Sequence, residues 1–231
     1  MKQQDLNKSD FKELLGRYKH LSLASLYGFA QIFFQYCERT VQPKYYMYSP
    51  LDDHIPFIKY FVIPYLFWFI YMGIAFLYLG LVSKKDYYLL CTYMFGGMYL
   101  CYVLYLIFPN GQQLRPIITE NDIFSRMIKH IYATDTPTNV APSIHVYNSI
   151  AVHVALTNSP GFKKKPLAKL ASLVCMLSIC ASTLFIKQHS IKDVMWSIVL
   201  AAALYPIAYL LPKRMDIKRP VTAEAKDMAF K

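Results

Sequence analysis

The chain has 231 residues, of which 55% are hydrophobic and only 17% are charged, and its net charge is +11. Its length would allow one or two soluble domains, but so apolar a composition excludes them and favours an integral membrane protein. The basic residues fall in short clusters rather than on a surface of interleaved basic and aromatic side chains, so we expect no nucleic-acid partner.

Several nearly uncharged runs predict membrane-spanning helices. Crossing a hydrocarbon core of roughly 30 Å takes about 20 mainly apolar residues. Two shorter and more polar stretches, 21–36 and 146–156, are spans only if the charge pattern requires them. The four runs of membrane length are 60–82, 87–108, 167–186 and 194–211.

The charge pattern requires both short stretches to span the membrane. Short loops rich in Lys and Arg mark the cytoplasmic side of a membrane, and the basic clusters here lie in 2–20, 84–85, 163–165 and 213–219. Six alternating spans place all four clusters on one side with both termini, whereas four spans scatter them. We therefore predict an all-α integral membrane six-helix bundle with both termini cytoplasmic and no cleavable signal peptide.

This topology divides the chain into three parts. Residues 1–20 form a cytoplasmic N-terminal segment, 21–211 the six-span domain and 212–231 a cytoplasmic C-terminal tail. The richness in Lys, Tyr, Ile and Phe favours a bacterial plasma membrane as the location. The longest outer loop, 109–143, is where we expect a functional site, because loops of this length often carry function.

The outer loop contains one further helical pattern. Phe108-Pro109-Asn110-Gly111 should end the preceding helix and turn the chain. Apolar residues then recur at helical spacing between 123 and 131, which predicts a short helix. This helix either lies in the membrane interface or packs as a cap over the loop.

Two histidine motifs lie where outer loops meet the start of apolar segments. The first is Pro142-Ser143-Ile144-His145, in which Ser143 is a plausible N-cap and His145 would occupy the first helical turn. In the second, Asp193 follows His189 by four residues, so both project from one side of a helix.

These motifs predict chemistry on a phosphate ester of a lipid. A carboxylate at Asp193 can accept a hydrogen bond from one ring nitrogen of His189 and leave the other a better nucleophile. Helix N-termini also favour anions through their free backbone N–H groups. Two such termini, with Arg115 in the loop between them, would form a phosphate pocket at the outer membrane face.

Together the motifs resemble the signature of the type 2 phosphatidic acid phosphatase superfamily. That signature is a Lys followed after six residues by Arg-Pro, then Pro-Ser-Gly-His, then Ser-Arg with His and Asp at fixed spacing. Arg115-Pro116, residues 142–145 and residues 182–193 match its three pieces, and the resemblance covers roughly 52–211. Residues 52–57 (Asp-Asp-His-Ile-Pro-Phe) also look like a segment that precedes the second span in some relatives.

Three positions depart from the family pattern. Phe108 stands at the Lys position, Ile144 replaces the usual Gly, and Thr183 replaces the Arg. Two phosphate-binding cations are therefore absent. Lys187 could supply one of them, and neutral donors could come from Gln112, Gln113 and Gln188.

The resemblance implies a role for each motif residue. His189 would attack phosphorus, Asp193 would orient it, and His145 would serve as general acid and base. Arg115 would bind phosphate oxygens, with Ser143, Ser182 and Lys187 as further phosphate-binding candidates. No metal and no cofactor are expected.

The substrate implied is a lipid phosphate, hydrolysed as a phosphomonoester or a pyrophosphate. The alternative is a phosphotransferase of the same fold that passes the phospho-headgroup to a lipid alcohol. A third alternative, a non-catalytic protein that binds anionic lipids, has no need for His and Asp at this spacing.

Overall fold

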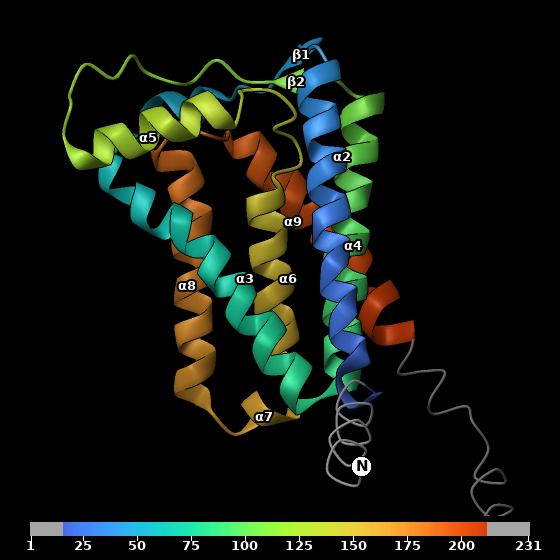
Figure 1. Cartoon of the computed structure of the whole chain (residues 1–231). Coiled ribbons are helices and arrows are strands. Elements are labelled where there is room, and N and C mark those ends of the chain that lie inside the picture. The colour runs from blue at the N-terminus through green and yellow to red at the C-terminus, as the bar shows by residue number, and fades with distance from the viewer. Residues whose placement is uncertain (1–15, 212–231) are drawn as a thin grey trace, which may run out of the picture.

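The computed structural model describes residues 16–211 and is mostly helical within them (Figure 1). Short 3₁₀ segments at Lys19–Ser25, Pro50–His54 and Lys59–Phe61 precede or join the longer helices, and a π-helical turn, Pro206–Leu210, continues the last one. The helices are α2 (Leu26–Thr40), α3 (Val62–Val82), α4 (Lys84–Ile107), α5 (Ile123–Thr134), α6 (Ile144–Asn158), α7 (Pro160–Lys163), α8 (Pro166–Phe185) and α9 (Ile191–Tyr205).

Four helices are long and apolar enough to cross a membrane: Lys59–Val82, Lys84–Ile107, Pro166–Phe185 and Ile191–Leu210. They correspond to the four long runs predicted from the sequence, with ends that differ by a few residues. Their outward faces expose apolar side chains, among them Leu77, Leu177 and Trp196, each more than half exposed. The all-α class and the membrane character of the chain are therefore supported.

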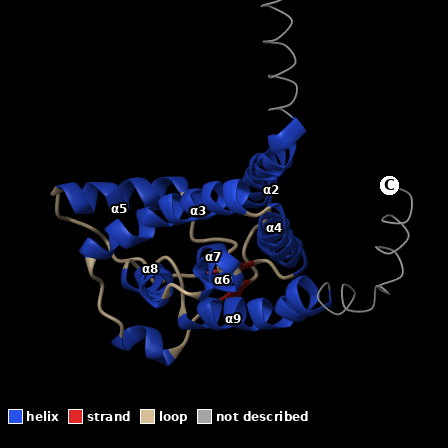
Figure 2. Cartoon of the chain, turned by 90° about the horizontal axis from the view of Figure 1, so that it is seen from below, coloured by secondary structure: helices blue, strands red, loops and turns tan. Residues whose placement is uncertain are grey.

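The two short predicted spans are helices, but neither reaches membrane length alone. Helices α2 and α6 have 15 residues each, or about 22 Å at 1.5 Å per residue. Helix α6 lies in the middle of the bundle, with α3, α4, α8 and α9 around it (Figure 2). Ten of its residues are buried, so it contacts protein rather than lipid and does not need a lipid-facing composition. The six-span topology remains a prediction.

The two basic turns within the described residues lie at the same end of the bundle. Lys84 and Lys85 begin α4, and Lys163–Lys165 precede α8, whereas α6 and α9 begin at the opposite end (Figure 1). Ser83 caps α4 by accepting a hydrogen bond from the Asp86 backbone N–H at 3.2 Å. The cluster at 213–219 and most of 2–20 lie outside the described residues.

Helix α5 lies across the ends of the upright helices as a packed cap (Figure 1). Asp122 is its N-cap and accepts from two backbone N–H groups. Its inner residues Ile128 and Ile131 pack in one buried cluster with Val62, Tyr65 and Ile186. The helix expected between 123 and 131 is confirmed, and the packing favours the cap over a helix that lies only in the membrane interface.

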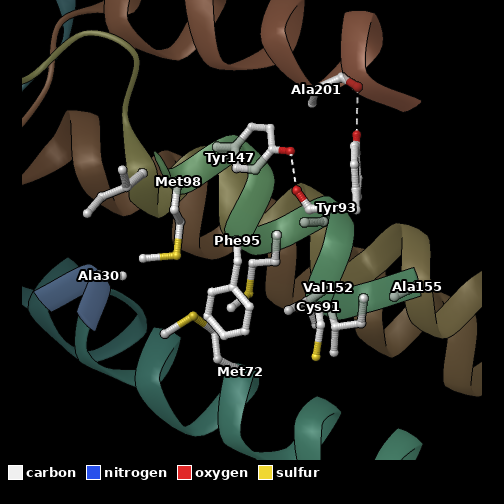
Figure 3. Close-up of a cluster of buried hydrophobic side chains, with 14 of the residues drawn as sticks. Ala30, Met72, Cys91, Tyr93, Phe95, Met98, Tyr147, Val152, Ala155 and Ala201 are labelled. Carbon is white, nitrogen blue, oxygen red and sulfur yellow. Dashed lines mark hydrogen bonds between the residues drawn. The ribbon is translucent and has the colours of Figure 1, made fainter. Parts of the chain in front are cut away.

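Three helices are joined by tyrosine hydroxyls inside the core (Figure 3). Tyr147 of α6 donates to the backbone oxygen of Tyr93 in α4 at 2.6 Å, and the Tyr93 hydroxyl donates to the backbone oxygen of Ala201 in α9 at 2.6 Å. The Tyr147 ring fits because residue 97 has no side chain: a Cβ on Gly97 would lie 1.9 Å from the ring. A small residue here lets two helices approach closely.

We expect Gly97→Ala to destabilise the protein by about 1–3 kcal/mol, because the added methyl overpacks the α4–α6 contact. Gly96→Ala is the matched control, since a Cβ at Gly96 meets nothing within 4 Å and alanine favours helix by about 1 kcal/mol. Thermal unfolding in detergent measures both. Equal midpoints for the two variants would contradict the close approach.

Candidate active site

His145 lies in the first turn of α6, as the motif predicts. Ser143 is the N-cap of the helix and accepts from the Val146 backbone N–H at 3.4 Å. The imidazole ring is buried between two aromatic side chains of α3, with ring-centroid distances of 4.6 Å to Tyr65 and 4.5 Å to Trp68. These contacts fix the position of the ring.

His189 lies on the tight turn that joins α8 to α9. The backbone N–H groups of Gln188 and His189 both donate to the carbonyl oxygen of Thr183, at 2.9 and 3.1 Å. Lys187 takes a left-handed conformation, with φ of 55°, to make this turn. The turn aims the buried His189 ring toward the start of α6.

Asp193 contacts the Nδ1 side of the His189 ring. Its Oδ2 lies 3.3 Å from His189 Nδ1 and also accepts from the Ser190 backbone N–H at 2.8 Å. Ser190 and Asp193 form a capping box at the start of α9. A carboxylate on Nδ1 leaves Nε2 as the ring nitrogen free to react.

The two histidine rings face each other because the starts of α6 and α9 are joined. Their centroids lie 5.9 Å apart. The Ser143 backbone N–H donates to the Asp193 carbonyl oxygen at 3.4 Å, and the Ser197 hydroxyl donates to the Ser143 carbonyl oxygen at 3.0 Å. The two motifs, 37 or more residues apart in the chain, thus meet at one place.

Asn110 holds the chain that leads into α6. Its side-chain oxygen accepts from the backbone N–H groups of Val140 and Ala141, at 2.9 and 2.8 Å, and its amide donates to the Ala141 carbonyl oxygen at 2.9 Å. The same residue begins strand β2 (Asn110–Gly111), which pairs in parallel with β1 (Tyr45–Tyr46). Sequence reasoning assigned Asn110 to a turn and did not find this role.

Asp52 holds the start of α9 from the segment between α2 and α3. The carboxylate of this buried residue accepts from the Ser190 hydroxyl at 2.6 Å and from the Ile191 backbone N–H at 2.9 Å. The Lys187 ammonium group donates to the Asp52 carbonyl oxygen at 2.8 Å. The only sequence signal for this contact is the resemblance of residues 52–57 to a segment of some relatives.

Arg115 lies against the loop that follows α5. Its guanidinium donates to the carbonyl oxygens of Tyr132 and Asp135, at 3.1 and 2.6 Å, and its centre lies 4.5 Å from the Tyr132 ring centroid. Burial lowers the pKa of the Arg115 guanidinium, and the neighbouring Asp135 carboxylate opposes that shift. The buried Nε of the guanidinium has no hydrogen-bond partner among the described residues, so its N–H is unpaired.

The histidines and Arg115 line one small cavity of about 10 Å³, with room for about one water molecule. Asp135 and Gln188 line it too, and sequence reasoning missed Asp135. The Asp135 Oδ2 accepts from the Tyr65 hydroxyl at 2.9 Å and from Gln188 Nε2 at 2.8 Å. Burial raises the pKa of the Asp135 carboxyl, while the nearby His189 ring lowers it.

The remaining phosphate-binding candidates are used elsewhere. The Ser143 hydroxyl caps α6, and the Ser182 hydroxyl donates to the Ile179 carbonyl oxygen at 2.6 Å. Lys187 lines a separate hollow beside Asp52. Gln112 donates to the Lys187 carbonyl oxygen at 3.0 Å. Within residues 16–211 no three His, Cys, Asp or Glu side chains gather as a metal site would need.

The fold and the site together define a class of protein: a helical protein with four membrane-length helices and a buried pair of histidines, one of which is hydrogen-bonded to a carboxylate. The model of the PAP2 superfamily matches residues 86–216 of the chain. The chain therefore belongs to this superfamily, the type 2 phosphatidic acid phosphatases, and its activity is of the phosphatase or phosphotransferase type. No curated protein and no solved structure matches the chain.

We expect Asp52→Asn to lower kcat by roughly 10- to 100-fold, because a small displacement of His189 is enough to cost this much. Asp53→Asn is the matched control: Asp53 is exposed and bonds only to the Tyr48 hydroxyl among the described residues. Release of a chromogenic phosphate ester measures both variants. If they turn over equally fast, Asp52 does not position the histidine turn.

Proposed function

We propose that the chain is a metal-independent membrane enzyme that hydrolyses a lipid phosphate, a phosphomonoester or a pyrophosphate, through a phosphohistidine on His189. One observation carries this proposal. Two buried histidine rings face each other at 5.9 Å, and one of them has a carboxylate oxygen 3.3 Å from its Nδ1. A nucleophile with an orienting partner and a second group for proton transfer are what a two-step displacement at phosphorus requires.

In the first step, Asp193 accepts the Nδ1–H of His189, and the lone pair on Nε2 attacks phosphorus. The bond from phosphorus to the leaving oxygen breaks, and protonated His145 gives its proton to that oxygen. In the second step, His145 takes a proton from water, the oxygen attacks phosphorus, and the bond to His189 breaks. General acid–base catalysis of this kind contributes typically 10²–10⁴-fold in rate.

Arg115 is the cation for the phosphate oxygens in this proposal. Its buried Nε–H has no partner among the described residues, and guanidinium binds phosphate well because its donors form a planar fork. For Ser143, Ser182 and Lys187 the contacts described above offer no support as phosphate ligands. They remain candidates only if the site rearranges when substrate binds.

A hollow beside the cavity supports a lipid as the substrate. It measures about 340 Å³ and shares Phe34, Asp135 and His145 with the histidine cavity. Its walls come from α2, α3 and α5 and are mainly aromatic and aliphatic. A second, almost entirely apolar hollow of about 250 Å³ adjoins it at Tyr27 and Phe69. An acyl or prenyl chain in these hollows would bring its phosphate to the histidines.

Transfer of the phospho-headgroup to a lipid alcohol is the alternative within the same fold. It uses the same two steps, with an alcohol in place of water. Either reaction would occur at the membrane face opposite the basic turns, which we propose is the outer face of a bacterial plasma membrane, with both termini cytoplasmic.

We expect His189→Ala to lower turnover by on the order of 10³-fold or more, because loss of a nucleophile removes the covalent route. His54→Ala is the control, since His54 is an exposed histidine that bonds to the Pro50 carbonyl oxygen. Purified protein in detergent is assayed with EDTA on a panel of lipid phosphates, and both phosphate release and new lipid products are measured.

Release of phosphate that survives EDTA and depends on His189 supports the hydrolase. A new lipid product without free phosphate supports the transferase. Full activity in His189→Ala would contradict both mechanisms. Neither phosphate release nor a new lipid product from the wild type would leave a protein that only binds anionic lipids.

A further inference from the structure

The histidine cavity contains a carboxylate that the proposed reaction does not use. Asp135 follows the last turn of α5 and lines the cavity together with His145, His189 and Arg115. Its Oδ2 accepts two hydrogen bonds, from the Tyr65 hydroxyl and from the Gln188 amide. Burial raises the pKa of this carboxyl, and the hydrogen bond from Tyr65 and the charge of Arg115 oppose that shift by stabilising the ionised form.

The cationic side chains near this carboxylate are few. Among the described residues that line the cavity, Arg115 is the one Lys or Arg. The Lys187 ammonium group is bonded to the Asp52 carbonyl oxygen outside the cavity. Positions 108 and 183 carry Phe and Thr. With both histidines neutral, Arg115 and Asp135 are the one positive and the one negative side chain among the residues that line the cavity, and Asp193 adds a second carboxylate beside the His189 ring.

This balance bears on the charge of the phosphate that can bind. A phosphomonoester carries about −1.5 to −2 at pH 7, because its second pKa is about 6, whereas a phosphodiester keeps a single negative charge. Charges interact strongly where water is excluded, so each extra unit on the phosphate is repelled by Asp135. Because Asp135 already balances the single guanidinium, a monoanion leaves one unpaired negative charge in the site and a dianion leaves two.

Resting on the histidine mechanism proposed above, we propose that Asp135 is a specificity-determining residue, whose carboxylate beside a single guanidinium makes the site select a monoanionic lipid phosphodiester over a dianionic phosphomonoester. His189 Nε2 then forms the bond to phosphorus, the ester bond to the leaving alcohol breaks, and His145 protonates that alcohol. A second alcohol, deprotonated by His145, or water displaces His189 and completes the reaction. A phosphodiester is the substrate class of headgroup transfer, so this proposal favours the transferase alternative over hydrolysis of a phosphomonoester or pyrophosphate.

The test compares two substrates that differ by one methyl group and one charge. Both are esters of a nitrophenol that carries a dodecyl chain, one the phosphate and the other the methyl phosphate, and nitrophenol release is followed in detergent. For the wild type we expect the diester-to-monoester ratio of kcat/KM to rise roughly tenfold between pH 5.5 and 8, as the monoester gains its second charge. Titration of the histidines affects both substrates and cancels in the ratio.

Asp135→Asn keeps an acceptor oxygen for Tyr65 and removes the charge. We expect it to lower the diester-to-monoester ratio at pH 8 by roughly tenfold. Glu120→Gln is the matched control, because it also removes a carboxylate from the outer loop, but from an exposed residue paired with Lys59. Its ratio should equal that of the wild type.

A ratio that is unchanged in Asp135→Asn, or a wild-type ratio that does not rise with pH, would overturn the proposal. If the variant fails to fold, as its thermal unfolding would reveal, the wild-type pH series decides alone. If cleavage depends on His189 but not on the charge of the substrate, the role of Asp135 is wrong and the proposed function stands. Cleavage of neither ester, or cleavage that persists in His189→Ala, removes the proposed function as well.

Discussion

The geometry of the site depends on the contact between the starts of α6 and α9. Ser143 donates its backbone N–H to the Asp193 carbonyl oxygen, and its own carbonyl oxygen accepts from Ser197. Each helix start carries one histidine, so this contact sets the 5.9 Å between the two rings. A backbone N–H at a helix start has no partner within its helix, and here the Ser143 N–H serves to join two helices. The loops before α3 and before α6 then contact this joined pair of helix starts rather than two separate ends.

Buried or half-buried carboxylates and one amide fix the loops around that pair, and nearly all their partners are backbone or hydroxyl donors. Asn110 holds the approach to α6 and Asp52 holds the start of α9. Glu38, near the end of α2, accepts from the Thr136 backbone N–H at 3.1 Å and from the Asn139 amide at 3.1 Å. Donors on several sides satisfy these groups and make their burial tolerable. Asp135 differs, because it faces the cavity in which the phosphate would bind.

The sequence predicts the long helices well, because a lipid-facing helix must be apolar over its whole length. It also predicts the Ser143 cap and the pairing of His189 with Asp193, since each depends on a short spacing within one helix start. It gives weaker signals for α6, because the neighbours of this helix are protein. It names Lys187 as a phosphate-binding candidate, and the left-handed turn at this residue places its ammonium group on the Asp52 carbonyl oxygen. The roles of Asp52 and Asp135 depend on contacts between residues 53 or more positions apart, which no local pattern records.

In the proposed mechanism, His189 forms a covalent bond to phosphorus while His145 moves protons. The most direct test uses His145→Ala with a nitrophenyl ester, whose leaving group needs no proton from the enzyme. We expect a burst of nitrophenol followed by slow turnover, since hydrolysis of the phosphohistidine then lacks the base that His145 supplies. Alkaline quenching, digestion and mass spectrometry should locate the phosphorus adduct on His189. An adduct on any other residue, or steady turnover without an adduct, would contradict a phosphohistidine on His189.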